Sequence, residues 1–338
     1  MKKSLKITLL MDLDWVPRDD PQLAGDSTEP LTERHVATAL REMGHEVAVV
    51  GVGGDVKQIV TALTEKPPEL VFNLVEQFRY DRRLDKEVAG LLELLGVPFT
   101  GSGTEGLMLC RDKALCKELL GLHRIQCPKF VRLAPEGRIR LPKAMGFPVI
   151  VKPQFGDASE GIAKASVVDS QEDLEARVRH VHEQHQQVAI AEEYVEGREL
   201  YVSVLGNARL TVFPPRELLF GNSEGAAPRI ATDRVKSDEA YREKWKISYG
   251  FARLTDEVSR MVERVAKRAC RLLRIRDYGR VDLRITAENK IRVLEVNANP
   301  DVAYGDDFAE SAAKAGITYN KLIDRIVNLA LRRHETEW

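Results

Sequence analysis

Residues 279–300 read Gly-Arg-Val-Asp-Leu-Arg-Ile-Thr-Ala-Glu-Asn-Lys-Ile-Arg-Val-Leu-Glu-Val-Asn-Ala-Asn-Pro. Two runs rich in β-branched residues, 280–286 and 291–296, flank the polar residues 287–290. This pattern is typical of two antiparallel strands joined by a short loop. The stretch is therefore predicted to be a β-hairpin.

Alternation along the strands predicts which side chains of the hairpin share a face. One face is polar and comprises Arg280, Asp282, Arg284, Val293, Glu295 and Asn297. The opposite face is apolar and comprises Val281, Leu283, Ile285, Leu294 and Val296. A four-residue loop would place Asp282 directly opposite Glu295 and Arg280 opposite Asn297. Two like charges that face each other in a sheet repel.

Two carboxylates and an amide oxygen at one place favour a hard divalent cation, most naturally Mg²⁺, because such ions take oxygen ligands. The alternative is a solvated strand face of mixed charge that needs no metal. The hairpin alone leaves both interpretations open.

Composition narrows the class of protein. A chain of 338 residues is longer than one typical domain of ~100–200 residues, so two or three packed units are expected. Its hydrophobic content of 43% suits a globular protein, and its net charge of −1 gives no long-range attraction to nucleic acid or anionic lipid. No stretch approaches the ~20 apolar residues of a membrane span. The composition therefore indicates neither a nucleic-acid partner nor a membrane partner.

The cysteines and the N-terminus favour a cytoplasmic protein. The cysteines show no paired metal-binding spacing and need no disulfide: Cys110, Cys116, Cys127 and Cys270. The apolar run after the basic N-terminus ends at Asp12 without a cleavage site, so it is predicted to be a first strand rather than a signal peptide.

Residues 5–75 alternate strands and helices, which predicts a parallel α/β layer. The predicted strands are 5–10, 46–52 and 70–74, and the predicted helices are 32–43 and 55–64. Neither a G-x-G-x-x-G nor a G-x-x-x-x-G-K-[ST] motif occurs. The polar segment 12–30 is expected to be a loop over the carboxyl ends of the strands, where open α/β sheets place ligands.

The middle of the chain carries several weak phosphate-binding signals in sequence. An apolar strand at 148–153 contains Lys152 and is followed by a glycine-punctuated loop, 154–162. Backbone N–H groups of such a loop can cover phosphates, and a lysine can reach them as a point charge. A helix at 171–186 and a strand at 188–195 follow. The charged segment 213–249 is predicted to be a loop too long for a mere connector.

The motif Arg-x-Asp followed by Leu-Glu-x-Asn-x-x-Pro in the hairpin resembles the metal end of ATP-grasp ligases, and of the D-alanine:D-alanine ligase branch in particular. The resemblance extends over residues 71–331. It implies an α/β protein with the ATP-grasp fold, in which an N-terminal parallel α/β (pre-ATP-grasp) domain precedes two α+β lobes that clamp ATP. The implied domains are 1–112, 113–198 and 199–338, with the metal site in the last.

The resemblance also implies roles for residues. Asp282, Glu295 and Asn297 would hold two Mg²⁺ ions, for which Mn²⁺ could substitute, and Arg280 and Lys236 would be catalytic cations. The residues that would bind ATP are Lys113, Lys152, Ser159, Glu192, Glu193, Val195, Glu199, Lys236 and Leu294. Among them, backbone groups of Glu193 and Val195 would meet the adenine edge. Glu192 and Glu199 would accept bonds from the adenine amino group or the ribose hydroxyls.

The sequence departs from the family pattern where substrates would bind. Asp157 and Asp301 stand in loops where family ligases carry other residues, and Glu76 stands where they have a histidine. Glu76 is expected to meet an ammonium, guanidinium or hydroxyl group of the first substrate. The alternative is a rim ion pair of Glu76 with Arg79 or Arg82.

The expected function is an ATP-dependent carboxylate–amine ligase that acts through an acylphosphate on amino-acid-like substrates other than D-alanine. One alternative is an authentic D-alanine:D-alanine ligase, and another is an ATP-binding regulatory protein without turnover. The expected partners are a small carboxylate and a small amine. The sequence leaves a homodimer open.

Overall fold

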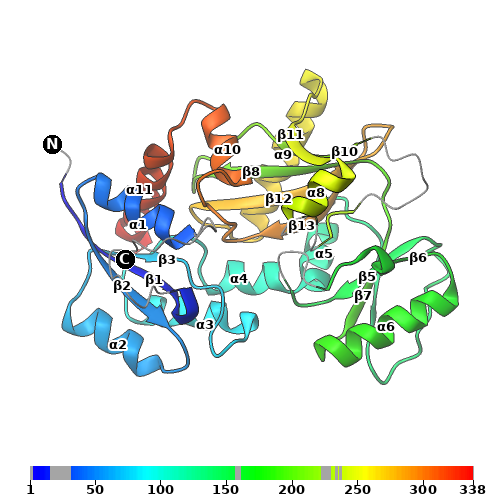
Figure 1. The fold of residues 1–338 in the computed structure, drawn as a ribbon, viewed down its shortest axis with the longest axis horizontal. Coiled ribbons are helices and arrows are strands. Elements are labelled where there is room, and N and C mark those ends of the chain that lie inside the picture. Colours follow the sequence, from blue (N-terminus) through cyan, green and yellow to red (C-terminus); the bar gives the residue numbers. More distant parts are fainter. Residues whose placement is uncertain are drawn as a thin grey trace.

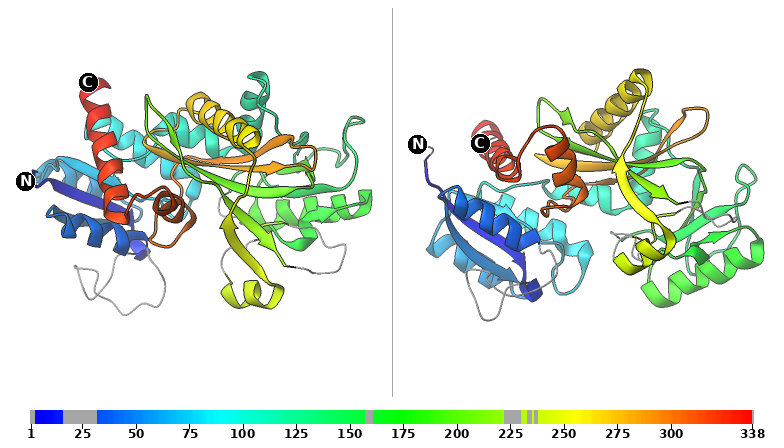
Figure 2. Two further views of the ribbon diagram at one scale, coloured as in Figure 1. Left: turned by 90° about the horizontal axis from the view of Figure 1, so that it is seen from above. Right: turned by 45° about the horizontal axis from the view of Figure 1, so that its top comes forward.

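The computed structural model describes residues 3–15, 32–156, 161–221, 230–232, 235 and 238–337. Its strands form sheets that lie side by side along the long axis of the molecule (Figure 1). Two further views show the N-terminal sheet at one end and a green, antiparallel sheet at the other, with the largest sheet between them (Figure 2). A mixed α/β architecture is therefore confirmed.

The N-terminal sheet is parallel, in the strand order β2-β1-β3. Its strands are β1 (Lys6–Asp12), β2 (Glu46–Val52) and β3 (Leu70–Asn73), and its helices are α1 (Thr32–Glu42), α2 (Val56–Glu65) and α3 (Asp85–Leu94). Gly44 ends α1 with a φ of 84°, a conformation that glycine adopts without steric cost. The parallel α/β layer predicted from the sequence is confirmed.

The second sheet is antiparallel, in the order β4-β7-β5-β6. Its strands are β4 (Phe130–Leu133), β5 (Val149–Pro153), β6 (Val167–Val168) and β7 (Ala189–Glu193). Helix α6 (Gln171–His185) packs against it through Leu174, Val178 and Val181. Two helices, α4 (Thr104–Arg111) and α5 (Lys113–Leu122), connect this sheet to the N-terminal layer, and α4 was not predicted.

The third sheet has the order β11-β10-β8-β12-β13, with β9 beside β8. Its strands are β8 (Arg198–Leu205), β9 (Thr211–Val212), β10 (Arg216–Phe220), β11 (Ile247–Phe251), β12 (Tyr278–Ile285) and β13 (Ile291–Asn297). Helix α9 (Asp256–Leu272) packs against this sheet.

The prediction of one loop over 213–249 is wrong in part. Strand β10, helix α8 (Glu239–Trp245) and the start of β11 lie within it. Leu218 pairs with Tyr249 across the antiparallel strands, and both lie in a small apolar cluster with Tyr201 of the neighbouring strand. The apolar residues of the two strands come together only after the chain has folded back, so the segment alone gave no such signal.

The hairpin register is confirmed at its centre, where Asp282 lies opposite Glu295 and Arg280 opposite Asn297. The predicted alternation is wrong next to it, because the register shifts after Asp282 and Leu283 pairs with Val293. A β-bulge of this kind inserts one extra residue into a strand. As a result Val293 joins the core, while Leu294 and Glu295 both line a cavity.

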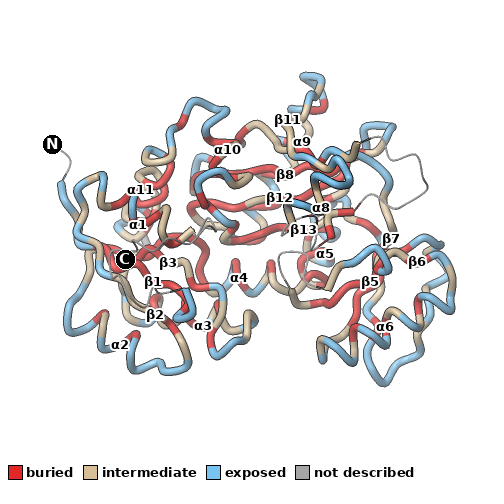
Figure 3. The backbone as a smooth tube through the Cα atoms, viewed as in Figure 1, coloured by how far each residue is buried: buried red, intermediate tan, exposed pale blue. Residues whose placement is uncertain are grey.

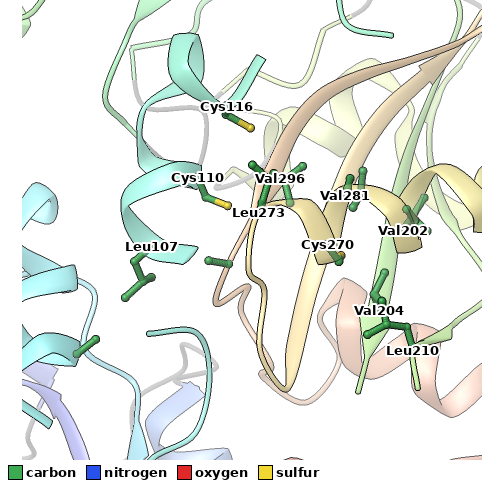
Figure 4. Packing of buried hydrophobic residues seen from close by; sticks show 14 of the residues in the cluster. Leu107, Cys110, Cys116, Val202, Val204, Leu210, Cys270, Leu273, Val281 and Val296 are labelled. Carbon is green, nitrogen blue, oxygen red and sulfur yellow. The ribbon is translucent and has the colours of Figure 1, made fainter. Parts of the chain in front are cut away.

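Burial follows the strands of all three sheets, as the red segments of Figure 3 show. The largest apolar cluster joins α4 and α5 to α9 and the hairpin. Figure 4 shows the thiols of Cys110 and Cys116 turned toward Val296 and Leu273 within it. The hairpin is therefore fixed against α5 by the same core.

The cysteines are free thiols, as predicted: Cys110, Cys116, Cys127 and Cys270. Burial raises the pKa of the Cys127 thiol to about 11 and those of Cys116 and Cys270 to about 12. These groups are accordingly neutral packing residues at ordinary pH.

Helices α10 (Asp307–Lys314) and α11 (Tyr319–Glu337) close the chain, and α11 packs against α1. The end of the proposed domain 199–338 thus shares an apolar cluster with the N-terminal layer. The boundary at 112/113 coincides with the start of α5, and that at 198/199 falls one residue inside β8. The division into three domains stays a prediction. No helix in the described parts of the chain is long and apolar enough to cross a bilayer.

Candidate active site

The polar face of the hairpin brings the predicted metal ligands together. Arg280 Nε donates to Asp282 Oδ1 at 2.7 Å and Arg280 Nη2 to Asp282 Oδ2 at 3.0 Å, and Asn297 Nδ2 donates to Asp282 Oδ2 at 3.2 Å. Within the described residues, the carboxylate of Glu295 has no hydrogen-bond or ion-pair partner. A partly buried carboxylate without a partner, opposite a second one, fits a bound cation.

The donor set at this place is small. Among the residues that the structure describes, no group of three or more histidine, cysteine or acidic side chains could hold a metal ion. Two carboxylates and one amide are enough for Mg²⁺ only where phosphates and water complete the shell, which is the usual arrangement at nucleotides. The hairpin therefore suits Mg²⁺ carried with a polyphosphate better than an isolated metal site.

A small cavity of about 70 Å³ lies between the second and third sheets. Its lining includes six residues with predicted roles in binding ATP: Lys152, Glu192, Glu193, Val195, Glu199 and Leu294. The metal candidates Asp282 and Glu295 lie on its wall. The structure thus brings these six predicted nucleotide residues and two of the three predicted metal ligands to one cavity, whereas Asn297 lines the larger cavity described below.

Glu192 is held by two lysines. Lys117 Nζ lies 3.1 Å and Lys152 Nζ 3.0 Å from Glu192 Oε1, and all three side chains are buried. Burial alone would raise the pKa of Glu192, but the two ammonium groups hold it below its usual value. Its predicted role as an acceptor for adenine or ribose is therefore in competition with two ion pairs. Lys117 was missed, because one lysine on an amphipathic helix gives no signal of a distant partner.

Glu199 is also engaged. Its carboxylate accepts from Arg284 Nη2 at 2.7 Å and from the hydroxyl of Tyr201 at 3.0 Å. Arg284 also donates to the carbonyl of Val195 at 2.6 Å, and so fixes the strand end at the predicted hinge. The sequence placed Arg284 on the polar face of the hairpin, and this position was the available signal for its role.

Lys113 and the backbone of Glu193 were also predicted to bind ATP. Lys113 is buried, and its ammonium donates to the carbonyl of Gly156, at the start of the predicted phosphate loop. The backbone N–H of Glu193 donates to the carbonyl of Lys129 at 2.8 Å, so only other groups of Glu193 could meet a base. Ser159, Lys236 and Asp157 lie outside the described residues.

A larger cavity of about 460 Å³ opens between the N-terminal layer, the hairpin and the start of α10. Glu76 lies at its edge with more than half of its side chain exposed, and its Oε2 is 3.1 Å from Arg82 Nη2. This is the rim ion pair that the sequence left as the alternative for Glu76. The backbone N–H of Ala303 donates to Asp301 Oδ1 at 2.8 Å, and the hydroxyl of Thr32 donates to the same oxygen.

One end of the larger cavity gathers three carboxyl groups, those of Glu33, Asp301 and Asp306. Burial raises the pKa of Glu33 to about 7, and burial together with the neighbouring Asp301 raises that of Asp306 to about 6. Protons are therefore retained here near neutral pH unless a cation binds.

Glu33→Gln is expected to stabilise the fold at pH 8 by roughly 3 kcal/mol, because the pKa of Glu33 is raised from 4.5 to about 7 and one pKa unit corresponds to about 1.36 kcal/mol. A carboxyl whose folded pKa is raised to about 7 from 4.5 weakens the fold as pH rises between those values, since the unfolded chain releases its proton first. The gain should fall to about 1 kcal/mol at pH 5. Urea unfolding at both pH values measures it, with the exposed Glu65→Gln as control; a gain independent of pH would contradict the burial of an ionisable carboxyl.

The overall fold also matches those of solved structures. D-alanine–D-alanine ligase from Bacillus anthracis, complexed with ATP, superposes with a TM-score of 0.75 over 99% of this chain and 100% of its own, at 21% identity. The D-alanine–D-alanine ligase of Coxiella burnetii superposes with a TM-score of 0.71 over 99% of this chain and 96% of its own, at 18% identity. The fold is that of the ATP-grasp enzymes.

Sequence comparison identifies the family. The family model described as the D-ala D-ala ligase C-terminus matches residues 125–328, more than half of the chain. The D-alanine–D-alanine ligase of Desulforudis audaxviator is 31% identical over 89% of this chain and 92% of its own length. The uncharacterized protein y4sG of Sinorhizobium fredii is 32% identical over 88% of this chain and 87% of its own length. The chain belongs to the D-alanine–D-alanine ligase family, and it is an ATP-grasp ligase of the type that forms a carbon–nitrogen bond.

Proposed function

We propose that this protein joins an amino-acid carboxylate to the amine of a second small molecule, at the expense of ATP. One observation carries the proposal: Glu295 lines both cavities, the small one with the predicted nucleotide residues and the larger one with Glu76 and Asp301. A group at this junction can act on the terminal phosphate and on a carboxylate at the same time. Membership in a family whose members use ATP and Mg²⁺ supports the assignment.

The proposed reaction has two steps. A carboxylate oxygen of the first substrate attacks the terminal phosphorus of ATP, giving an acylphosphate and ADP. The amine of the second substrate then attacks the acyl carbon, loses a proton and displaces phosphate, leaving an amide. Negative charge grows on the transferred oxygens in both steps, so preorganised cations lower the barriers.

The residues that would provide this environment lie around the junction. Asp282, Glu295 and Asn297 would hold Mg²⁺, with two ions expected and Mn²⁺ as a substitute. Bound Mg²⁺ would neutralise charge on the phosphates. Arg280 lies on the wall of the larger cavity and would stabilise charge on the reacting carboxyl, and Lys152 would bind phosphate from the wall of the small one.

For the substrate, the names of the relatives favour D-alanine as both acid and amine. The ligase of Desulforudis audaxviator and that of Aquifex aeolicus, at 28% identity, both carry this name. These names support the interpretation that the sequence had placed second. D-Alanine is therefore the first substrate to test.

A second candidate keeps the chemistry and changes the substrate to an amino-acid-like molecule with an additional cationic group. The observation that favours it is the group of three carboxyl side chains, Glu33, Asp301 and Asp306, at one end of the larger cavity. An ammonium or guanidinium beside Glu33 and Asp306 would lower their raised pKa values and so favour the charged carboxylates.

The test is release of ADP and phosphate with ATP and Mg²⁺, followed by mass spectrometry of the products. The panel contains D-alanine, L-alanine, other amino acids of both configurations, diamino acids and dipeptides. D-Alanyl-D-alanine as the main product supports the first candidate. Faster turnover with a diamino acid supports the second; in that case Glu33→Gln should raise the KM for that substrate more than Glu76→Gln, since Glu76 already pairs with Arg82. If none of the compounds in the panel supported ATP turnover, both candidates would be contradicted.

A further inference from the structure

Lys117, Lys152 and Glu192 form a buried charge cluster behind the small cavity. They come from α5, β5 and β7, and their side chains are 1%, 7% and 1% exposed. Both ammonium groups lie about 3 Å from the same carboxylate oxygen. The ammonium of Lys117 also donates to the carbonyl of Leu294, the bulge residue of β13.

The cluster has one positive charge more than it needs for neutrality. With two lysines and one glutamate its sum is +1, whereas a single lysine would neutralise Glu192. Burying charges costs desolvation energy that apolar residues of similar volume would avoid. The additional charge is therefore best explained by a use for it.

The two lysines differ in position. Lys152 lines the small cavity together with Glu192, whereas Lys117 lines neither of the two cavities at the junction. Lys117 approaches Glu192 from helix α5, which the largest apolar cluster holds against the hairpin. An anion in the small cavity would meet Lys152, and it would not meet Lys117.

We propose that Lys117 is a positioning residue that neutralises Glu192 from behind and so leaves the positive charge of Lys152 available for the phosphates of the nucleotide. The inference rests on the proposed function, because it assumes that a nucleotide occupies the small cavity. Without Lys117, Glu192 and Lys152 form a neutral pair, and the cavity loses its attraction for phosphate. Through Leu294, Lys117 also holds the strand that carries Glu295.

The experiment compares two ligands by calorimetry, ADP with Mg²⁺ and adenosine, and reads the ratio of their affinities. The base and ribose contacts are common to both ligands, so the ratio isolates the phosphates. Lys117→Met should lower the preference for ADP roughly tenfold to a hundredfold, as expected for one charge lost at several Å in a partly desolvated place. Lys152→Ala serves as a positive control with a similar loss.

Restoring the charge separates this proposal from a merely structural role. Glu192→Gln raises the sum of the cluster to +2, and Lys117→Met combined with Glu192→Gln returns it to +1. The double variant should recover the wild-type preference for ADP, although it lacks the same lysine as the single variant. Glu118→Gln, an exposed charge change on the same helix, should leave the preference unchanged.

The outcomes are distinct. An unchanged preference in Lys117→Met, or no recovery in the double variant, overturns the role of Lys117 and leaves the proposed function standing. If Lys117→Met does not fold, the double variant is compared with Glu192→Gln alone, and equal preferences again overturn it. A wild-type protein that binds neither ligand, or binds both equally, overturns the nucleotide site and with it both proposals.

Discussion

Glu295→Gln is expected to abolish ligation in a protein that still folds. The carboxylate of Glu295 faces Asp282 and has no other partner among the described side chains, so its neutralisation relieves repulsion without leaving an unpaired charge. The same change removes a Mg²⁺ ligand at the junction of the two cavities. Turnover should fall roughly a thousandfold, which corresponds to a loss of several kcal/mol of charge stabilisation. Steady-state ADP release and thermal unfolding measure the two effects.

The matched control is Glu288→Gln, the same change in the exposed loop of the same hairpin. It should keep wild-type turnover. Asp282→Asn should lose turnover as well, but it also weakens the bidentate pair with Arg280. Its loss would therefore combine the effect of a missing Mg²⁺ ligand with that of a displaced Arg280. Wild-type turnover in Glu295→Gln would contradict the metal assignment. A loss of turnover would contradict it too if excess Mg²⁺ did not restore turnover and the apparent affinity for Mg²⁺ were unaltered.

The sequence predicted those parts of the fold in which local pattern and tertiary structure agree. The two β-branched runs and the polar loop between them predict the hairpin and the pair of Asp282 with Glu295. The predicted four-residue loop is wrong, because Ile285 pairs with Ile291, and the bulge at Leu294 offsets this difference before Asp282 is reached. The alternation of strands and helices in residues 5–75 likewise predicted the parallel layer, since each element there carries its own period and its own stop.

Other features depend on contacts between distant segments and leave no local signature. The bulge at Leu294 breaks the alternation, yet the sequence of β13 reads as a regular strand. Strands β10 and β11 pair across a long charged segment that has few apolar residues. Ion pairs such as that between Lys117 and Glu192 form only after helix α5 has packed against the second sheet. For these features tertiary contacts, rather than propensity, decide the structure.

The substrate residues show why a motif can locate a site and still misjudge a partner. Glu76 stands at the end of an apolar strand, which correctly places it at the edge of a cavity. Its carboxylate forms an ion pair with Arg82, which follows after a turn. The sequence alone did not decide between this pair and an Arg82 side chain that extends into solvent. Glu33, by contrast, lies in the first turn of α1, where a carboxylate is common because it interacts favourably with the helix dipole. Nothing in the sequence indicates that its side chain is buried beside the cavity.

Arg280 is the cation best placed to act on the reacting carboxyl. Its guanidinium forms a bidentate pair with Asp282 and lies 5.4 Å from the centre of the Tyr201 ring, and it lines the larger cavity rather than the small one. Planar donors in a fixed fork suit an oxyanion that develops beside them. A ligand that takes up Asp282 would release donors of Arg280 toward the larger cavity.

Arg280→Met is therefore expected to slow turnover by roughly 10² to 10³, as loss of one oxyanion donor does (about 2.7 to 4 kcal/mol). The affinity for ADP should hardly change, because the small cavity keeps Lys152. Arg280→Lys should recover part of the rate, since it restores the charge but not the fork. Turnover and ADP affinity are measured at several Mg²⁺ concentrations, since Asp282 loses its partner in the variant. If ADP affinity fell together with turnover and excess Mg²⁺ restored neither, Arg280 would act on the phosphates, and the charge on the reacting carboxyl would have to be stabilised by another group.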